Sequence, residues 1–206
     1  EPVVAVAAGR AFTFGYPEHA ELLAAAGARV VEFDPLNESL PTDTSALVLG
    51  GGFPEEHAEE LSGNEPLRTA VRAHVAAGRP VHAECAGYLY LTSGVVRDGR
   101  AGPPLAAALP VQAEFGQRLT LGYRDGVALT DSVLYRAGDR VTGHEFHRST
   151  VAPGRAPAWG WHADGARVDG HVHKGVHASF LHIHPAAVPD AVRRFVETAT
   201  AAGEEV

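Results

Sequence analysis

The chain has 206 residues, of which 45% are hydrophobic and 20% are charged. These values are typical of a soluble globular protein with one sizeable core or at most two small ones. A formal net charge of −8 argues against binding to nucleic acid, and no apolar run approaches the roughly 18 residues of a membrane helix. One cysteine excludes an internal disulfide and favours a reducing, cytoplasmic setting. Because the chain begins at Glu1 and has no methionine, we expect it to be part of a longer protein.

The first half of the chain alternates short apolar runs with segments of helical periodicity. The apolar runs predict strands at residues 3–8, 29–33, 46–49 and 80–83. Helices are predicted to begin at Pro17 and Pro66 and to end at Gly27 and Gly78, because Pro suits the first helical turn and Gly the C-terminal cap. Strands that alternate with helices in this rhythm predict an α/β fold, a mostly parallel sheet with helices on both faces.

The second half shows the alternating pattern of antiparallel strands. Such runs occupy residues 117–124, 126–129 and 140–150 and both flanks of Asp169-Gly170. Asp125-Gly126, between the first two runs, is typical of a tight hairpin turn. We expect these strands to be added to the parallel sheet and a last helix to follow Pro185. The apolar face of that helix is expected to carry Val188, Val192, Phe195 and Ala199.

The single cysteine lies in the segment A-E-C-A-G, residues 83–87, where the fourth predicted strand ends. Small residues on either side are typical of a strand that turns abruptly into a helix and holds the middle side chain out at the sheet edge. At such a turn the backbone N–H of Ala86 lies at a helix N-terminus, where it can stabilise a thiolate or a developing oxyanion. A lone cysteine is about as often a small apolar residue in a core, so both interpretations of Cys85 stand at this point.

A glycine run follows the third predicted strand, in the segment L-G-G-G-F-P-E, residues 49–55. Glycines at this position allow the backbone N–H groups of Gly51 or Gly52 to approach a ligand, as an oxyanion hole requires. A plain strand-to-helix turn is the alternative. Neither G-x-G-x-x-G nor G-x-x-x-x-G-K-[ST] occurs, so no nucleotide phosphate site of either common type is predicted.

Two histidines end the apolar run A-S-F-L-H-I-H, residues 178–184. A thiol needs a base at neutral pH, and histidine is the usual one. Residues two apart on a strand share a face, so His182 and His184 are expected to point the same way and could form an imidazole relay. A surface or metal-binding pair is the alternative, but the cysteine, the glycine run and the histidines together favour a nucleophilic site.

Other histidines gather in the second half of the chain. The segment H-E-F-H, residues 144–147, is one residue too short for the zincin motif. His171, His173 and His177 alternate on a predicted strand and could collect a metal. Without a cysteine cluster nearby, we expect no metal site here and predict a solvated strand face or a polar substrate wall.

Five segments, taken in order, carry a more specific signal than any one of them alone. They are Y-P-E-H-A-E-L-L-A-A-A-G-A (16–28), L-G-G-G-F-P-E-E-H (49–57), A-E-C-A-G-Y-L-Y-L (83–91), G-H-E-F-H-R-S (143–149) and A-S-F-L-H-I-H (178–184). Together they resemble the C-terminal glutamine amidotransferase domain of cobyrinic acid a,c-diamide synthases. The resemblance covers nearly the whole chain and implies a class I glutamine amidotransferase fold, as one domain over residues 1–206.

The resemblance implies roles for particular residues. It makes Cys85 the nucleophile that attacks glutamine and His182 the residue that raises its nucleophilicity, with backbone N–H groups of Ala86 and of Gly51 or Gly52 around the oxyanion. The usual class I pattern is His-x-Glu, whereas His184 stands at the position of that Glu. The cobyrinate-type branch is known for lacking the acid, so what orients His182 stays open.

The resemblance also implies partners. Full-length enzymes of the family carry an N-terminal ATP-binding domain, which uses ATP and Mg²⁺ to activate corrin carboxylates and receives the ammonia. Nothing in these residues looks like that domain, so we expect the glutaminase part alone, without a cofactor of its own, acting in cobalamin biosynthesis. The alternatives are an amidotransferase or γ-glutamyl hydrolase of the same fold with another substrate, or a non-enzymatic Cys/His redox or metal sensor.

Overall fold

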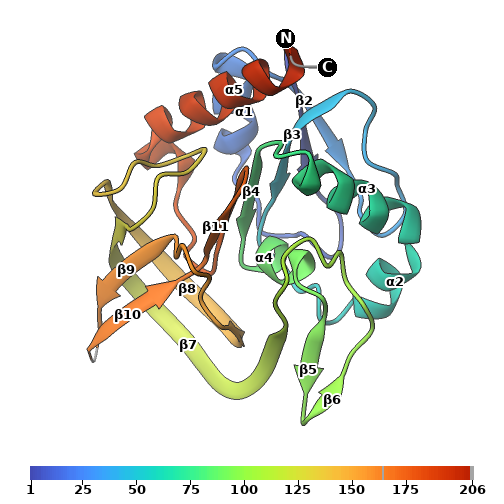
Figure 1. Ribbon diagram of the computed structural model, residues 1–206, viewed down its shortest axis with the longest axis vertical. Helices are drawn as coiled ribbons and strands as arrows, with labels where there is room; N and C mark the ends of the chain where they lie inside the picture. Colours follow the sequence, from blue (N-terminus) through green and yellow to red (C-terminus); the bar gives the residue numbers. More distant parts are fainter. Residues whose placement is uncertain (164, 205–206) are drawn as a thin grey trace.

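The first of two six-stranded sheets has the strand order β11-β12-β4-β3-β1-β2 (Figure 1) in the computed structural model, which describes residues 1–163 and 165–204. Its strands are β1 (Val3–Ala7), β2 (Arg29–Phe33), β3 (Thr44–Leu49), β4 (Val81–Glu84), β11 (His171–His173) and β12 (Val176–Ser179). All neighbours pair in parallel except β11, which pairs antiparallel with β12 at the edge. The four strands predicted in the first half are therefore confirmed.

Helices cover both faces of this sheet (Figure 1). One face carries α1 (Pro17–Ala25) and α5 (Pro189–Glu204), and the other carries α2 (Ala58–Gly63), α3 (Glu65–Ala76) and α4 (Ala86–Leu91). Side chains of β3 alternate between the two layers, since Leu47 packs with the α3 side and Val48 with the α5 side. Burial on both faces explains why these strands read as continuous apolar runs. Val192, Phe195 and Ala199 of α5 are buried, as expected.

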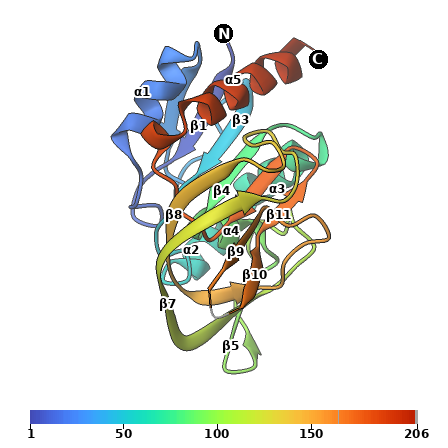
Figure 2. The same ribbon diagram turned by 90° about the vertical axis from the view of Figure 1, so that its left-hand side faces the viewer.

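The second sheet is built from strands between residues 95 and 169 (Figure 2). Its members are β5 (Val95–Arg97), β6 (Arg100–Ala101), β7 (Ala113–Ala128), β8 (Arg140–Val151), β9 (Trp159–His162) and β10 (Ala166–Asp169). The expectation of antiparallel strands is confirmed, but most of them form a separate sheet rather than extending the first one. Only β11 joins the parallel sheet.

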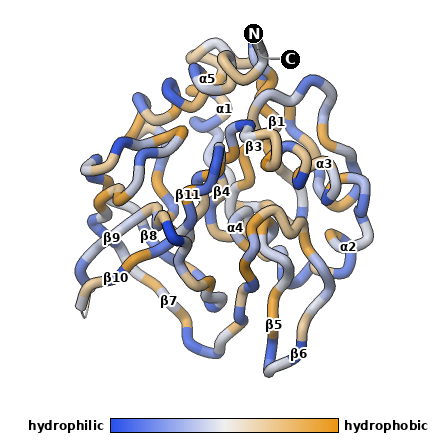
Figure 3. Tube along the Cα trace, viewed as in Figure 1, coloured by the Kyte–Doolittle hydropathy of each residue, from blue (hydrophilic) through white to orange (hydrophobic). Residues whose placement is uncertain are grey.

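The hairpin predicted at Asp125-Gly126 is wrong. β7 runs straight through this dipeptide, and Asp125 and Gly126 pair with Thr142 and Val141 of β8. The surroundings of the glycine are closely packed, since a Cβ on Gly126 would lie 3.3 Å from a Leu181 methyl group and at ordinary contact distance from Val141 and Trp159. More exposed and less exposed positions alternate along β7 from Thr120 to Ala128, without a break at the dipeptide. Figure 3 shows that β7 carries both hydrophilic and hydrophobic residues.

The three histidines considered as metal ligands are distributed over two strands. His171 and His173 lie on β11 and His177 on β12. The Tyr88 hydroxyl lies 2.5 Å from His171 Nδ1, and Ser132 Oγ lies 3.0 Å from His177 Nδ1. Within residues 1–163 and 165–204, no three His, Cys, Asp or Glu side chains are arranged to hold a metal ion. Over the same residues, no helix has the length and apolar character needed to cross a membrane.

Candidate active site

Cys85 lies at the turn between β4 and α4. Its backbone has φ 48° and ψ −96°, a left-handed conformation that costs a non-glycine residue on the order of 1–3 kcal/mol and is concentrated at functional sites. The Cys85 N–H donates to the Ser179 carbonyl at 2.8 Å, which fixes the turn to β12. A Cβ at Gly87 would lie 2.1 Å from the Leu49 carbonyl oxygen. The tight packing of the turn explains the small residues around the cysteine.

The Cys85 side chain opens into a cavity of about 440 Å³. The cavity is lined by Thr13, Phe14, Gly15, Tyr16, Gly52, Phe53, Cys85, Leu121, His144, Phe146 and His182. Cys85 itself is only 7% exposed, and its Sγ lies 3.8 Å from the Phe146 carbonyl oxygen. The structure thus brings Cys85, His182 and Gly52 together, with the sulfur within a pocket instead of on the open surface.

Burial controls the charge of the sulfur. It raises the pKa of the Cys85 thiol to about 12, and the negative charges of Glu55 and Glu84 act in the same direction. The hydrogen bond from the Ala86 N–H lowers that pKa but does not outweigh burial. The expected stabilisation of a thiolate at the helix N-terminus is therefore too small, and the resting group is a neutral thiol. A thiol of this kind needs a base beside it before it can attack.

His182 is a buried base held from several sides. Its ring stacks on His144, with centroids 5.0 Å apart and planes at 12°. Backbone hydrogen bonds of 3.0 Å and 2.9 Å join the same two residues. Burial lowers the pKa of His182, whereas the charge of Glu84 opposes that shift. The imidazole is consequently neutral near pH 7 and able to accept a proton.

His184 lies outside this cavity. Because β12 ends at Ser179, the expectation that His182 and His184 share a face of one strand is wrong. The His184 side chain is 47% exposed and contacts the Tyr16 ring with a centroid distance of 4.6 Å. Its Nδ1 accepts the Ala186 N–H at 3.3 Å at the start of the short 3₁₀ helix Pro185–Ala187. An imidazole relay through His184 has no support.

The two glycines expected near the oxyanion differ in their surroundings. Gly52 lines the cavity. The Gly51 N–H instead donates to the Phe14 carbonyl at 3.3 Å, and a Cβ on Gly51 would lie 2.7 Å from His182 Cε1. Gly51 therefore gives the imidazole room, whereas Gly52 is the better placed of the two to face a substrate.

Sequence reasoning missed Glu84, although it lies directly before the nucleophile candidate. Its carboxylate is buried, with Oε2 3.7 Å from His182 Nδ1 and Oε1 3.3 Å from His82 Nε2. The Ile183 N–H also donates to Oε1 at 3.3 Å. Strand alternation places residues 82 and 84 on one face, but no local pattern indicates that His182 reaches the same carboxylate.

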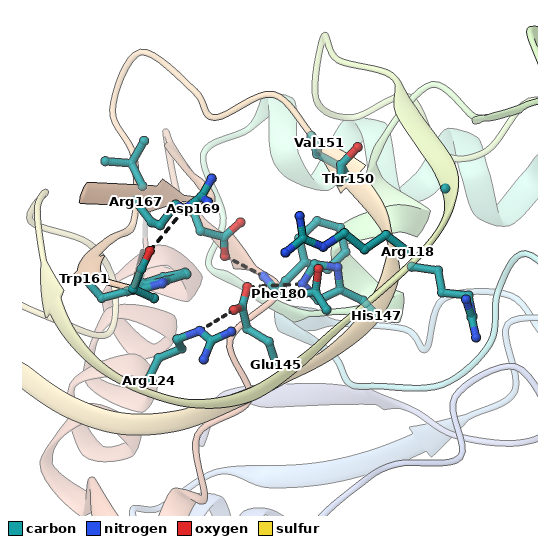
Figure 4. Close-up of a pocket in the computed structure, with 15 residues that line it drawn as sticks. Arg118, Arg124, Glu145, His147, Thr150, Val151, Trp161, Arg167, Asp169 and Phe180 are labelled. Atoms are coloured by element: carbon teal, nitrogen blue, oxygen red, sulfur yellow. Dashed lines mark hydrogen bonds and ion pairs between the residues drawn. The ribbon is translucent and has the colours of Figure 1, made fainter. Parts of the chain in front are cut away.

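A second hollow, of about 390 Å³, lies on the other face of β8 (Figure 4). It is lined by Arg118, Arg124, Arg148 and Arg167 together with Glu145, His147, Asp169 and Phe180, among others. Glu145 accepts from Arg124 at 2.7 Å and lies 3.1 Å from His147. Along β8, His144 and Phe146 line the first cavity, whereas Glu145 and His147 line this one.

Solved structures place this architecture among known folds. A glutamine amidotransferase crystal structure matches with a TM-score of 0.66 at 23% identity, covering 96% of this chain and 98% of that one. A glutamine amidotransferase from Thermotoga maritima matches with a TM-score of 0.62 at 14% identity, covering 99% and 96%. The fold is that of the class I glutamine amidotransferases, as the sequence predicted.

The family follows from sequence comparison. A model of the CobB/CobQ-like glutamine amidotransferase domain matches residues 3–189, and the chain belongs to that family. Hydrogenobyrinate a,c-diamide synthase of Mycobacterium tuberculosis is 58% identical over 94% of this chain and 42% of its own length. The protein of the same name from Streptomyces coelicolor is 57% identical over 94% and 40%. Cobyrinate a,c-diamide synthase of Synechococcus is 39% identical over 94% and 44%.

Two consequences follow from these matches. The chain spans less than half the length of the curated relatives that it matches. Family membership also decides the class of protein, because the domain is a glutamine amidotransferase and the alternative of a non-enzymatic redox or metal sensor falls away.

Proposed function

We propose that this domain releases ammonia from glutamine through a thioester on Cys85. The observation that carries the proposal is the strained turn at Cys85, which opens into the same cavity as the buried base His182. His182 takes the thiol proton as the sulfur attacks the amide carbon. The backbone N–H groups of Ala86 and Gly52 stabilise the oxyanion, and removal of one such donor typically costs on the order of 100-fold in rate.

The remaining steps return the site to its resting state. The protonated His182 gives its proton to the departing nitrogen, which leaves as ammonia. His182 then takes a proton from water as the water oxygen attacks the thioester carbonyl, and the proton passes to the sulfur as glutamate is released. The cavity volume suits a small amino acid, and the neutral resting state of both groups fits a base that must accept a proton first.

The ammonia is proposed to serve the amidation of the a and c carboxylates of a corrin, hydrogenobyrinic or cobyrinic acid, in cobalamin biosynthesis. The names of the relatives support this substrate class. ATP and Mg²⁺ would act in an ATP-binding synthetase part, corresponding to the segment of those relatives that this chain does not match. A cytoplasmic location fits a biosynthetic step of this kind.

A partner domain is supported by the mouth of the cavity. Several large apolar side chains that line it are exposed, namely Phe14, Phe53, Leu121 and Phe146. Tyr123 is exposed beside them, with its ring 6.3 Å from that of the cavity residue His144. Leu121 is 63% exposed and Tyr123 is 81% exposed. An apolar patch beside a site is typical of an interface. The patch is proposed to pack against the synthetase part, so that ammonia is released toward it.

The test compares single variants of the chain. Cys85→Ala should abolish glutamine hydrolysis and labelling by the glutamine analogue 6-diazo-5-oxo-L-norleucine, while the circular dichroism spectrum and Tm stay those of a folded domain. His182→Ala should reduce turnover by on the order of 1,000-fold, while His184→Ala stays within about threefold of the parent. Glutamine hydrolysis by the Cys85→Ala variant, or equal losses in the two histidine variants, would contradict the assignment.

A further inference from the structure

Glu84 is the carboxylate nearest to His182. It lies at the end of β4, immediately before Cys85, and is buried. Its Oε2 lies 3.7 Å from His182 Nδ1. The imidazole also lines the cavity that Cys85 lines, so His182 has contact with both the carboxylate and the cavity of the proposed attack. The position two residues after His182 holds the exposed His184, which is turned to Tyr16.

We propose that Glu84 is the positioning residue of His182 and completes a Cys85–His182–Glu84 triad, in which the acid comes from the residue before the nucleophile. The inference rests on the proposed glutaminase function of the site. A base held by a third group keeps one tautomer and one orientation. With Nδ1–H directed at Glu84, the Nε2 lone pair is left to accept the thiol proton.

The distance suits an orienting ion pair that shortens during the reaction. At 3.7 Å the Nδ1 and Oε2 atoms are too far apart for a good hydrogen bond but within range of an ion pair. Catalytic hydrogen bonds are often long before substrate binds and tighten when charge develops. When His182 takes the proton, its positive charge appears beside the buried carboxylate, and this attraction stabilises the imidazolium.

Glu84 has other partners that keep it ionised and fixed. His82 Nε2 and the Ile183 N–H both lie 3.3 Å from Oε1. Burial alone would raise the pKa of Glu84, but the hydrogen bond from His82 and the attraction to the protonated forms of His82, His182 and His19 lower it overall. His19 and His177, which also face the carboxylate, have pKa values lowered by burial and are neutral near pH 7.

The other titratable groups around the pair come from two loops and from β8. Tyr16 and Tyr135 lie near Glu84, and the nearby carboxylate contributes to the raised pKa of each phenol, in which burial is the larger cause. His144 and His147 of β8 act on His182, and both lower the pKa of its imidazole. Among these neighbours Glu84 supplies the negative charge, so its removal should be visible in the pH dependence of the reaction.

The first experiment compares Glu84→Gln with Glu145→Gln in the glutaminase assay. Both residues are buried carboxylates in contact with a histidine, but Glu145 faces the second hollow. Glu84→Gln keeps the shape and an acceptor for the Ile183 N–H. It should lower kcat by on the order of 100-fold, change KM for glutamine by less than about threefold, and move the acid limb of kcat/KM to lower pH. Glu145→Gln should leave kcat and that limb unchanged.

Retained kcat in Glu84→Gln, or a loss without any movement of the acid limb, would overturn the inference. If that variant does not fold, nitrogen-15 NMR of the histidines in the parent protein still tests the inference, because it identifies the tautomer of His182. The Nδ1–H tautomer of His182 is expected above its pKa, and the Nε2–H tautomer would overturn the proposal. If the glutamine analogue labels Cys85 in the parent protein but Glu84→Gln has the kcat of the parent, this inference is wrong and the proposed function stands. Absence of labelling at Cys85 in the parent protein would contradict the proposed function.

Discussion

The imidazole rings of His144 and His182 are stacked, with their planes 12° from parallel. They come from different sheets, because His144 lies on β8 and His182 follows β12. The paired backbone hydrogen bonds between the two residues make this contact a direct connection between the parallel sheet and the second sheet. The second sheet therefore supports the proposed base as well as forming a wall of the cavity.

Removal of this support should reduce turnover without abolishing it. His144→Ala leaves one face of the His182 ring without a partner, and we expect kcat for glutamine hydrolysis to fall about tenfold because the base is less well oriented. His144→Phe keeps an aromatic ring at the same place and should restore most of the activity. Unchanged kcat in His144→Ala would show that the stacking has no role in orientation.

The reactivity of Cys85 should report a protonated thiol. Since burial raises its pKa to about 12, the thiolate fraction in the absence of substrate grows about tenfold per pH unit between pH 7 and 9. The rate of alkylation by iodoacetamide should rise accordingly and show no plateau below pH 9. Cys85 is the only cysteine in the chain, so mass spectrometry of the intact protein measures this site directly. A plateau near pH 7 would mean that the resting group is a thiolate.

Gly52 should not tolerate a side chain. A Cβ at this position would lie 2.1 Å from the Ala11 carbonyl oxygen, and backbone cannot move away without opening the loop. We expect Gly52→Ala to lower Tm by several degrees and to reduce glutamine hydrolysis by at least about tenfold. The control is Gly63→Ala at the end of α2, where a Cβ meets nothing within 4 Å; it should be neutral or slightly stabilising.

Asp169 should make the protein less stable as the pH rises. Burial raises the pKa of its carboxyl to about 7, above the ordinary value of 3.8. Between these two values the folded state holds a proton that the unfolded state has lost, so stability falls with rising pH until about pH 7. Asp169→Asn keeps an acceptor for the Phe180 N–H and should raise Tm by roughly 5 °C at pH 8. At pH 4 the variant and the parent should melt within about a degree of each other, and an equal difference at both pH values would contradict the assignment.

Leu121 tests the apolar patch at the cavity mouth. We expect Leu121→Glu to weaken association with the N-terminal part of the Mycobacterium tuberculosis relative by at least about tenfold, because a charge would be buried in the interface. Leu129→Glu is the matched control: the same change at an exposed leucine that does not line the cavity. Surface plasmon resonance with each variant immobilised measures its affinity for that N-terminal part. Equal affinity of the two variants would place the interface elsewhere.

Local patterns predicted four strands of the first sheet and the turn at Cys85 because each depends on neighbouring residues. Apolar runs, helix-starting prolines and small flanking residues act within a few positions of one another. The Asp125-Gly126 prediction was wrong because β7 continues through the dipeptide and pairs there with β8, a partner that no local pattern indicates. Glycines at turns and glycines at close contacts have the same sequence signal.

The surroundings of the base could not be predicted for the same reason. Glu84 ends β4, which begins at Val81, whereas His182 follows β12, which begins at Val176, so the two residues are distant in the sequence. His144 comes from another sheet. The position of His184 depended on where β12 ends, and strand ends are poorly marked in sequence. The residue types needed for the site were visible, whereas their partners required the folded chain.

The alternation of side chains along β8 has a consequence for how this protein can change in evolution. Because neighbouring residues of the strand face different hollows, a substitution can alter one hollow while the other is left alone. Insertion or deletion of one residue would exchange the two faces, and Glu145 and His147 would then turn toward the sulfur. Insertions or deletions of an odd number of residues are therefore excluded in this segment, even at positions where the residue type is free to vary.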